Sequence, residues 1–235
     1  MMVVTKVRHH WALSLFTLFF LPLTLVLGIW QLDRAQQKDE LVLSLAALEQ
    51  ALPRAPGDRL TALADHQRVT LNAQFIKPYV WFRDNQVVKG KVGYDVIGVV
   101  AVGPELLLVN RGWFASNGQR NPLPYMQWPE GDITLTGRLV PTTANPYQLA
   151  ADVYTSDYPQ LVQALDLPQL QQQFKRPLLP WVLMLDAPSP ALLTPHWQAS
   201  SMTAAKHLGY AWQWFGLALT LCLLYIYRVF YSPLR

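Results

Sequence analysis

The chain has 235 residues, of which 51% are hydrophobic and only 14% charged, whereas about a quarter are charged in ordinary soluble proteins. The net charge of +4 comes from its two ends, which carry Lys6, Arg8, Arg228 and Arg235 and no acid. Because the interior is neutral overall, it offers no basic face for DNA or RNA, and we exclude nucleic acid as a partner. The single cysteine, Cys222, excludes an intramolecular disulfide and a cysteine-rich metal site.

A charge-free run of twenty residues occupies 11–30, and at ~1.5 Å per residue it matches the ~30 Å hydrocarbon core of a bilayer. We predict a transmembrane helix there, after a short tail over 1–10. A cleaved signal peptide is the competing interpretation, but this run exceeds the usual apolar region of about 7–15 residues and no A-x-A-like site follows it. Because no amphipathic, Arg- and Ser-rich leader precedes the run, we favour a bacterial inner (plasma) membrane over a mitochondrial one.

Helical periodicity continues over 31–52, which predicts that the first helix extends out of the membrane as an amphipathic juxtamembrane helix. Trp30, Arg34 and Lys38 stand four apart and share one face of this helix. We consider two roles for this cationic face: binding the phosphates of the lipid bilayer, or binding the carboxylates of a ligand. The periodic apolar positions are Leu41, Val42, Leu45, Leu48 and Leu52.

Between the two apolar runs, short segments that alternate apolar and polar side chains predict an antiparallel, β-rich (α+β) domain, folded as a small barrel or sandwich. A turn at 84–86 is expected to close a hairpin, and 156–167 is expected to form a short helix that Pro168 ends. Residues 114–131 and 186–205 are expected to be loops. The candidate strands are 68–75, 79–84, 94–102, 106–113, 133–140 and 181–185.

A second charge-free run of twenty residues, 208–227, has Trp and Tyr near its start and Tyr at its end, as the aromatic belts of membrane helices do. We predict a second transmembrane helix there, followed by a cytoplasmic tail over 228–235. The positive-inside rule keeps both basic tails in the cytoplasm and places 31–207 outside, as a periplasmic domain. The fold class is therefore a membrane protein with two transmembrane helices flanking an extracytoplasmic domain.

An imidazole stands just before the second run. His207 shares a helix face with Tyr210, Ala211 and Trp214, and it is expected at the same height as the cationic face of the first helix. Two interpretations stay open for His207. It could bond a loop carbonyl or a lipid headgroup, or its neutral ring could ligate haem iron while the two cations take the propionates.

A four-residue motif, Asn110-Arg111-Gly112-Trp113, lies on a predicted strand. Alternation on a strand places the side chains of Arg111 and Trp113 on the same face. We favour a structural role, with Trp113 in the core and Arg111 on a turn or a carboxylate, over a binding role. The other histidines, His9, His10, His66 and His196, have no partner at metal-ligand spacing and are interpreted as surface or loop residues. No Ser-His-Asp, H-E-x-x-H or paired-carboxylate arrangement is present, so we do not expect an enzyme.

Three separated motifs, LGIWQLDRAQQK at 27–38, LLVNRGWF at 107–114 and HLGYAWQWF at 207–215, resemble those of the surfeit-locus (Surf/Shy) family of cytochrome c oxidase assembly factors. The resemblance implies a non-enzymatic inner-membrane chaperone that binds haem a, assists its insertion into oxidase subunit I and works beside haem a synthase. It also implies that His207 is the haem ligand. Two other classes stay open: a two-span receptor or scaffold whose outer β domain binds a peptide or small ligand, and a membrane-bound enzyme.

Overall fold

A computed structural model describes residues 10–50, 63–118, 122–142, 152–197 and 202–231 of the chain. The chain divides into two compact units. The helical unit comprises Met1–Ser44 and Gln198–Arg235, and the β unit comprises Leu45–Trp197.

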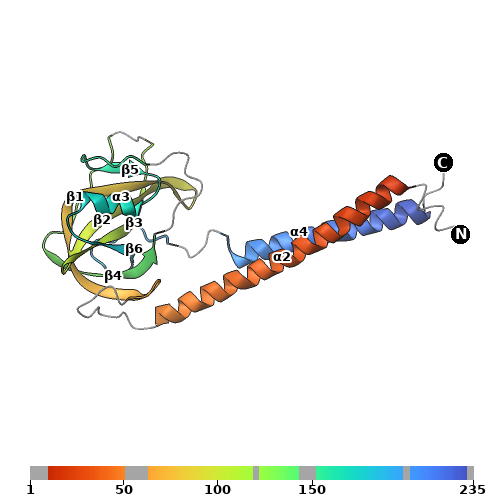
Figure 1. The fold of residues 1–235 in the computed structure, drawn as a ribbon, viewed down its shortest axis with the longest axis horizontal. Helices are drawn as coiled ribbons and strands as arrows, with labels where there is room; N and C mark the ends of the chain where they lie inside the picture. The colour runs from red at the N-terminus through yellow and green to blue at the C-terminus, as the bar shows by residue number, and fades with distance from the viewer. Residues whose placement is uncertain (1–9, 51–62, 119–121, 143–151, 198–201, 232–235) are drawn as a thin grey trace. The chain divides into compact units, whose positions relative to one another are not determined.

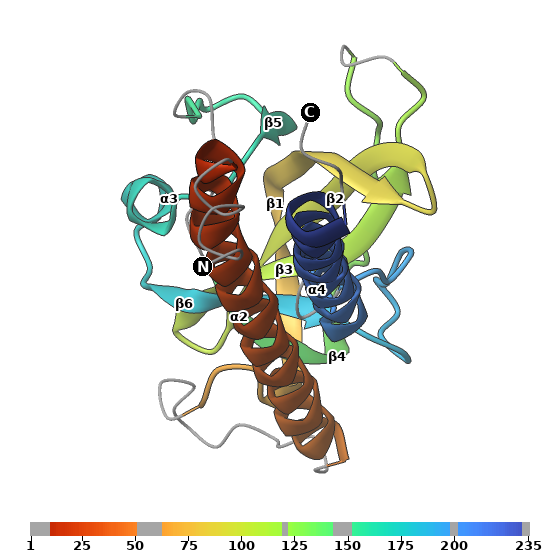
Figure 2. The ribbon, with the colours of Figure 1, turned by 90° about the vertical axis from the view of Figure 1, so that its right-hand side faces the viewer.

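The helical unit contains two long helices that run side by side in Figures 1 and 2. α2 (Trp11–Gln50) continues without a break for forty residues and lies in this unit as far as Ser44. α4 (Ala204–Ile226) ends in one π-helical turn, Tyr227–Tyr231. Both are long and apolar enough to cross a bilayer. They are antiparallel, because hydrogen bonds join Ser14 to Tyr225 near one end of the pair and Gln31 to His207 near the other.

Small side chains line the seam between the two helices, which lets their backbones approach closely. Gly28 is one of them, since a Cβ at this position would come within 2.5 Å of the Phe215 ring. Successive buried positions are four or seven residues apart, as in a coiled-coil seam. They are Thr17, Thr24, Gly28 and Ala35 on α2, and His207, Ala211 and Ala218 on α4.

In the β unit, five strands form a closed ring. The first half of β1 pairs with β4, its second half pairs with β2, and β3 and β6 complete the circuit. All neighbours are antiparallel except β3 and β6. Of the two architectures expected from the sequence, the pairing therefore selects the barrel. The strands are β1 (Arg68–Val88), β2 (Lys91–Val102), β3 (Glu105–Ala115), β4 (Asp132–Pro141) and β6 (Leu178–Leu185).

Alternate residues of these strands fill a core made almost entirely of aliphatic side chains, as period-2 alternation requires. On β1, for example, Val69, Leu71 and Ala73 are buried while Asn72 and Gln74 are exposed. All six predicted strands are confirmed, although the first two form the single strand β1.

A second apolar cluster joins residues of the barrel strands, such as Trp81, to Val162 and Leu170 in the segment that follows β4. Our prediction for part of this segment is wrong. The helix expected over 156–167 is absent. Instead this stretch contains β5 (Gln160–Val162), which pairs in parallel with β1, and α3 (Leu167–Gln173) follows it. Asp166 caps α3 by accepting a hydrogen bond from the Gln169 backbone. Pro168 begins the helix rather than ending another, because proline needs no amide donor in a first turn.

The hairpin expected at 84–86 is also wrong. Asn85 has a positive φ of 59°, but it forms a β-bulge, one extra residue on β1 opposite β2. The turn comes later, at Lys89 and Gly90, whose positive φ values of 50° and 76° are those a two-residue hairpin turn needs. The expected loops are confirmed over their described residues, except that β3 continues to Ala115 and α4 begins at Ala204.

Candidate functional site

The imidazole of His207 lies in the seam of the helical unit, in the first turn of α4. The residue is only 7% exposed. Its Nδ1 lies 2.7 Å from the side-chain oxygen Oε1 of Gln31 on α2. The partner of His207 is therefore a side chain of the other helix, and not the loop carbonyl considered from the sequence.

This bond sets the chemistry of the ring. An amide oxygen only accepts hydrogen bonds, so Nδ1 carries the proton and donates it to Gln31. In the neutral ring the lone pair is then on Nε2. The described residues offer Nε2 no hydrogen-bond partner. The seam thus holds an imidazole with one nitrogen occupied and the other available to a ligand.

The cationic face of α2 lies close to Gln31, because Trp30 precedes Gln31 directly and Lys38 follows it by seven residues, which is two helical turns. The Arg34 guanidinium lies over the Trp30 ring, 5.4 Å from its centroid, and donates to Gln37 Oε1 at 2.8 Å. Trp30 and Arg34 are exposed and Lys38 is half-buried. Within the described parts of the chain, neither Arg34 nor Lys38 has a carboxylate in ion-pair distance. Both cations can therefore bind an anion from outside the chain.

Of the two aromatic residues assigned to the His207 face, Tyr210 is 43% exposed and Trp214 is half-buried. Ala211, between them in sequence, is the buried contact of this face. Tyr210 and Trp214, three and seven residues after His207 on α4, thus keep part of their side chains exposed.

The Asn110–Trp113 motif lies in the β unit, where it makes contacts within the fold. Arg111 is buried and donates to two backbone carbonyls, those of Ala191 at 2.7 Å and Gln127 at 2.8 Å. Its guanidinium stacks over Trp128, 4.5 Å from the ring centroid. Burial lowers the pKa of Arg111 to about 10, so the group stays charged at neutral pH. We expected a turn or a carboxylate as its partner, and the turn is confirmed, because Ala191 lies in one. The indole of Trp128 is a further partner.

The strand is irregular at Gly112, so its side chains do not alternate regularly between the two faces there. Alternation therefore no longer requires Arg111 and Trp113 to share a face. A bulge in the β2–β3 pairing falls here, and Gly112 has a φ of 109°. A Cβ on Gly112 would lie 2.6 Å from the carbonyl oxygen of Thr194. Trp113 and Thr194 exchange backbone hydrogen bonds. The motif therefore holds the segment around Thr194, which follows β6, by backbone hydrogen bonds.

A buried carboxylate beside the motif lies close to His196. Asp95 is fully buried and pairs with Arg83, and Asn110 donates to it at 3.0 Å. His196 Nε2 lies 3.1 Å from the other oxygen of Asp95. His196 is therefore a loop residue, as expected from the sequence, and its ring lies within ion-pair distance of a buried carboxylate.

The remaining histidines stay apart from these clusters. His66 lies in the loop before β1, and His10 lies just before α2. His9 is outside the described residues. No group of three or more His, Cys, Asp or Glu side chains that could hold a metal ion occurs in the described ranges.

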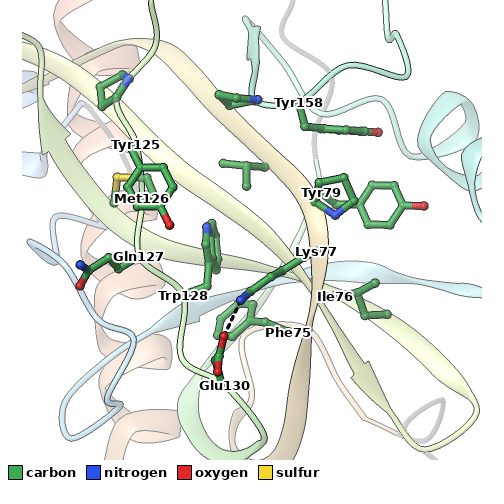
Figure 3. Close-up of a pocket in the computed structure, with 14 residues that line it drawn as sticks. Phe75, Ile76, Lys77, Tyr79, Tyr125, Met126, Gln127, Trp128, Glu130 and Tyr158 are labelled. Atoms are coloured by element: carbon green, nitrogen blue, oxygen red, sulfur yellow. Dashed lines mark hydrogen bonds and ion pairs between the residues drawn. The ribbon is translucent and has the colours of Figure 1, made fainter.

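The β unit also has a pocket of about 520 Å³ between β1 and the loop before β4 (Figure 3). Phe75 and Trp128 stack edge-to-face on one side of it, with their ring centroids 4.8 Å apart. A salt bridge between Lys77 and Glu130 spans 2.9 Å. This hydrogen bond raises the pKa of Lys77 and lowers that of Glu130. Such a volume and mostly apolar lining suit a small ligand.

Sequence reasoning missed Gln31 and the pocket. A signal for Gln31 was present, because Thr17, Thr24 and Gln31 follow each other at seven-residue intervals and so lie on one stripe of α2. That stripe, rather than the one through Trp30, faces α4. The pocket had no such signal, since its walls come from segments far apart in the chain.

Two comparisons with known proteins match most of the chain. The SURF1 family profile matches residues 18–219. A SURF1-like protein of Rickettsia felis (strain ATCC VR-1525 / URRWXCal2) is 27% identical over 229 residues, which cover 92% of this chain and 96% of that relative. The chain therefore belongs to the SURF1 family, a family of cytochrome oxidase assembly factors rather than of enzymes.

Proposed function

We propose that this protein binds haem a through His207 and assists its insertion into subunit I of cytochrome c oxidase, next to haem a synthase. The observation that carries the proposal is the state of His207. Its Nδ1 is held by Gln31 at 2.7 Å, so its Nε2 has the lone pair that an axial ligand of haem iron needs.

The neighbouring residues fit such a ligand. Haem a would supply an iron atom for the imidazole of His207 and propionates for nearby cations. Arg34 and Lys38, one and two turns along α2 from Trp30, provide two cations without carboxylate partners among the described residues. Tyr210 and Trp214 provide an apolar surface that excludes water next to the imidazole.

The proposed location is a bacterial inner membrane, which the two apolar helices support. Both termini would be cytoplasmic and the β unit periplasmic, because the two ends of the chain carry basic residues and no acid. His207, at the start of α4, would then lie at the outer edge of the membrane.

The function is tested by expressing the full chain together with a haem a synthase, purifying it in detergent and recording its optical spectrum. We expect a Soret band and the spectrum of haem a after extraction. A protein that is well folded but free of haem would contradict the proposal.

The pocket of the β unit favours the second candidate, a receptor or scaffold that binds a small ligand. The two functions respond differently to one change. Tyr125→Ala removes an exposed side chain from the pocket wall, so it should weaken ligand binding by a receptor, whereas it should leave the Soret band of a haem chaperone in place.

A further inference from the structure

We propose that Gln31 is a positioning residue for the haem ligand, which holds His207 in one tautomer and keeps its bond to iron weak enough for the haem to be passed on. This inference rests on the proposed function, and it assigns a role to a residue that touches the imidazole rather than the iron.

The first step of the argument is geometric. The 2.7 Å bond between Gln31 Oε1 and His207 Nδ1 joins the two helices of one unit. His207 is only 7% exposed, so water cannot easily replace Gln31 as the acceptor. An imidazole ring that is fixed at one nitrogen has its other nitrogen aimed in one direction, and a ligand needs that preorganisation.

The second step concerns the strength of the acceptor. Histidines that ligate metals commonly donate their other N–H to a carboxylate, which raises the basicity of the ring, or to a neutral carbonyl. Here the acceptor is a neutral amide oxygen. In the described residues, no carboxylate is paired with His207. An amide therefore orients the ring while adding little electron density to it.

The third step links this chemistry to release. A strongly basic imidazole binds iron tightly and slows the departure of the haem. A chaperone has to give up its cargo, so a neutral acceptor suits a carrier better than a carboxylate would. The physical consequence is that the haem potential and the rate of haem release should both depend on residue 31.

Two substitutions change the acceptor in opposite directions. Gln31→Glu places a carboxylate at Nδ1, which should shift the reduction potential of the bound haem to lower values and slow its transfer to apomyoglobin. Gln31→Leu removes the acceptor. It should shift the potential to higher values and weaken haem binding by about 10- to 100-fold, as loss of such outer partners does at metal sites.

The matched control is Tyr225→Phe, which removes the other hydrogen bond between the same two helices, Ser14 to Tyr225. It should change neither the potential nor the transfer rate. If both Gln31 variants bind haem with the wild-type potential and transfer rate, the positioning role is overturned. If the wild-type protein itself takes up no haem, the proposed function fails instead. If His207→Ala changes the haem spectrum and neither Gln31 variant does, the role of Gln31 is overturned while the proposed function stands.

Discussion

Arg111 shows how a charged residue can serve the fold. It is 6% exposed, and it donates to the carbonyls of Ala191 and Gln127 while stacking over Trp128. A planar guanidinium can do all three at once, and a lysine ammonium cannot. The motif that carries Arg111 therefore secures the loop after β6 to the ring.

We expect Arg111→Lys to destabilise the β unit. Loss of a directed, charge-assisted hydrogen bond in a buried place costs about 2 kcal/mol, which corresponds to a fall of about 4–8 °C in the thermal midpoint for a domain of this size. Circular dichroism of the purified protein measures it. Lys77→Gln is the control, because exposed ion pairs contribute little. Equal midpoints for wild type and Arg111→Lys would show that the contacts of Arg111 do not stabilise the fold.

The two cations of α2 allow a second test at the residue scale. Replacing both Arg34 and Lys38 by Gln should weaken haem retention, because two carboxylates would lose their counter-charges. The matched control replaces Lys89 and Lys91, exposed cations of the β1–β2 hairpin, by Gln. Haem occupancy after gel filtration is the measurement. Equal occupancy in the two double variants would support binding of lipid phosphates by the α2 cations instead.

At the scale of elements, the seam between α2 and α4 depends on small side chains. Gly28→Leu would drive a side chain into the Phe215 ring, which lies within 2.5–2.9 Å of the position of a Cβ. Overpacking of this kind costs about 1–3 kcal/mol. We expect a lower thermal midpoint by tryptophan fluorescence in detergent.

Gly209→Leu is the control for the seam, since nothing lies within 4 Å of a Cβ at that position of α4. This variant should melt like the wild type. A Gly28→Leu variant as stable as Gly209→Leu would mean that the two helices do not pack closely at Gly28.

The strands could be predicted from the sequence because each has one face in the core, and burial then imposes a period of two. The elements that cover the outside of the ring left no such pattern. β5 has three residues and α3 has seven, too few to show a period. Pro168 favoured the end of a helix and the start of one equally, and only the cap from Asp166 decides between them.

For the whole molecule, the order of the chain, with one apolar helix before a β domain and another after it, could be predicted from the sequence, because a bilayer demands about twenty apolar residues per helix. The contacts of His207 could not be predicted from the sequence. The sequence places the imidazole near the cations of α2, but the partner that orients it depends on the rotation of each helix about its axis, and packing sets that rotation.

Orientation in the membrane is a prediction about the whole molecule. With basic residues at both ends of the chain, both termini should stay in the cytoplasm. Alkaline phosphatase fused at position 235 should be inactive, and fusions within 63–118 should be active. An active fusion at position 235 or an inactive one within the β unit would reverse the topology.

The central claim is that His207 ligates the haem iron, and the optical spectrum of the His207→Ala variant tests it most directly. The variant should be inserted in the membrane like the wild type, because one side chain contributes little to the insertion of a long apolar helix. Tyr225→Phe serves as the control for the helix pair. We predict that His207→Ala, and likewise His207→Met, loses haem or shows a shifted Soret band, while Tyr225→Phe keeps the wild-type spectrum. Wild-type occupancy with an unshifted spectrum in His207→Ala would contradict the claim.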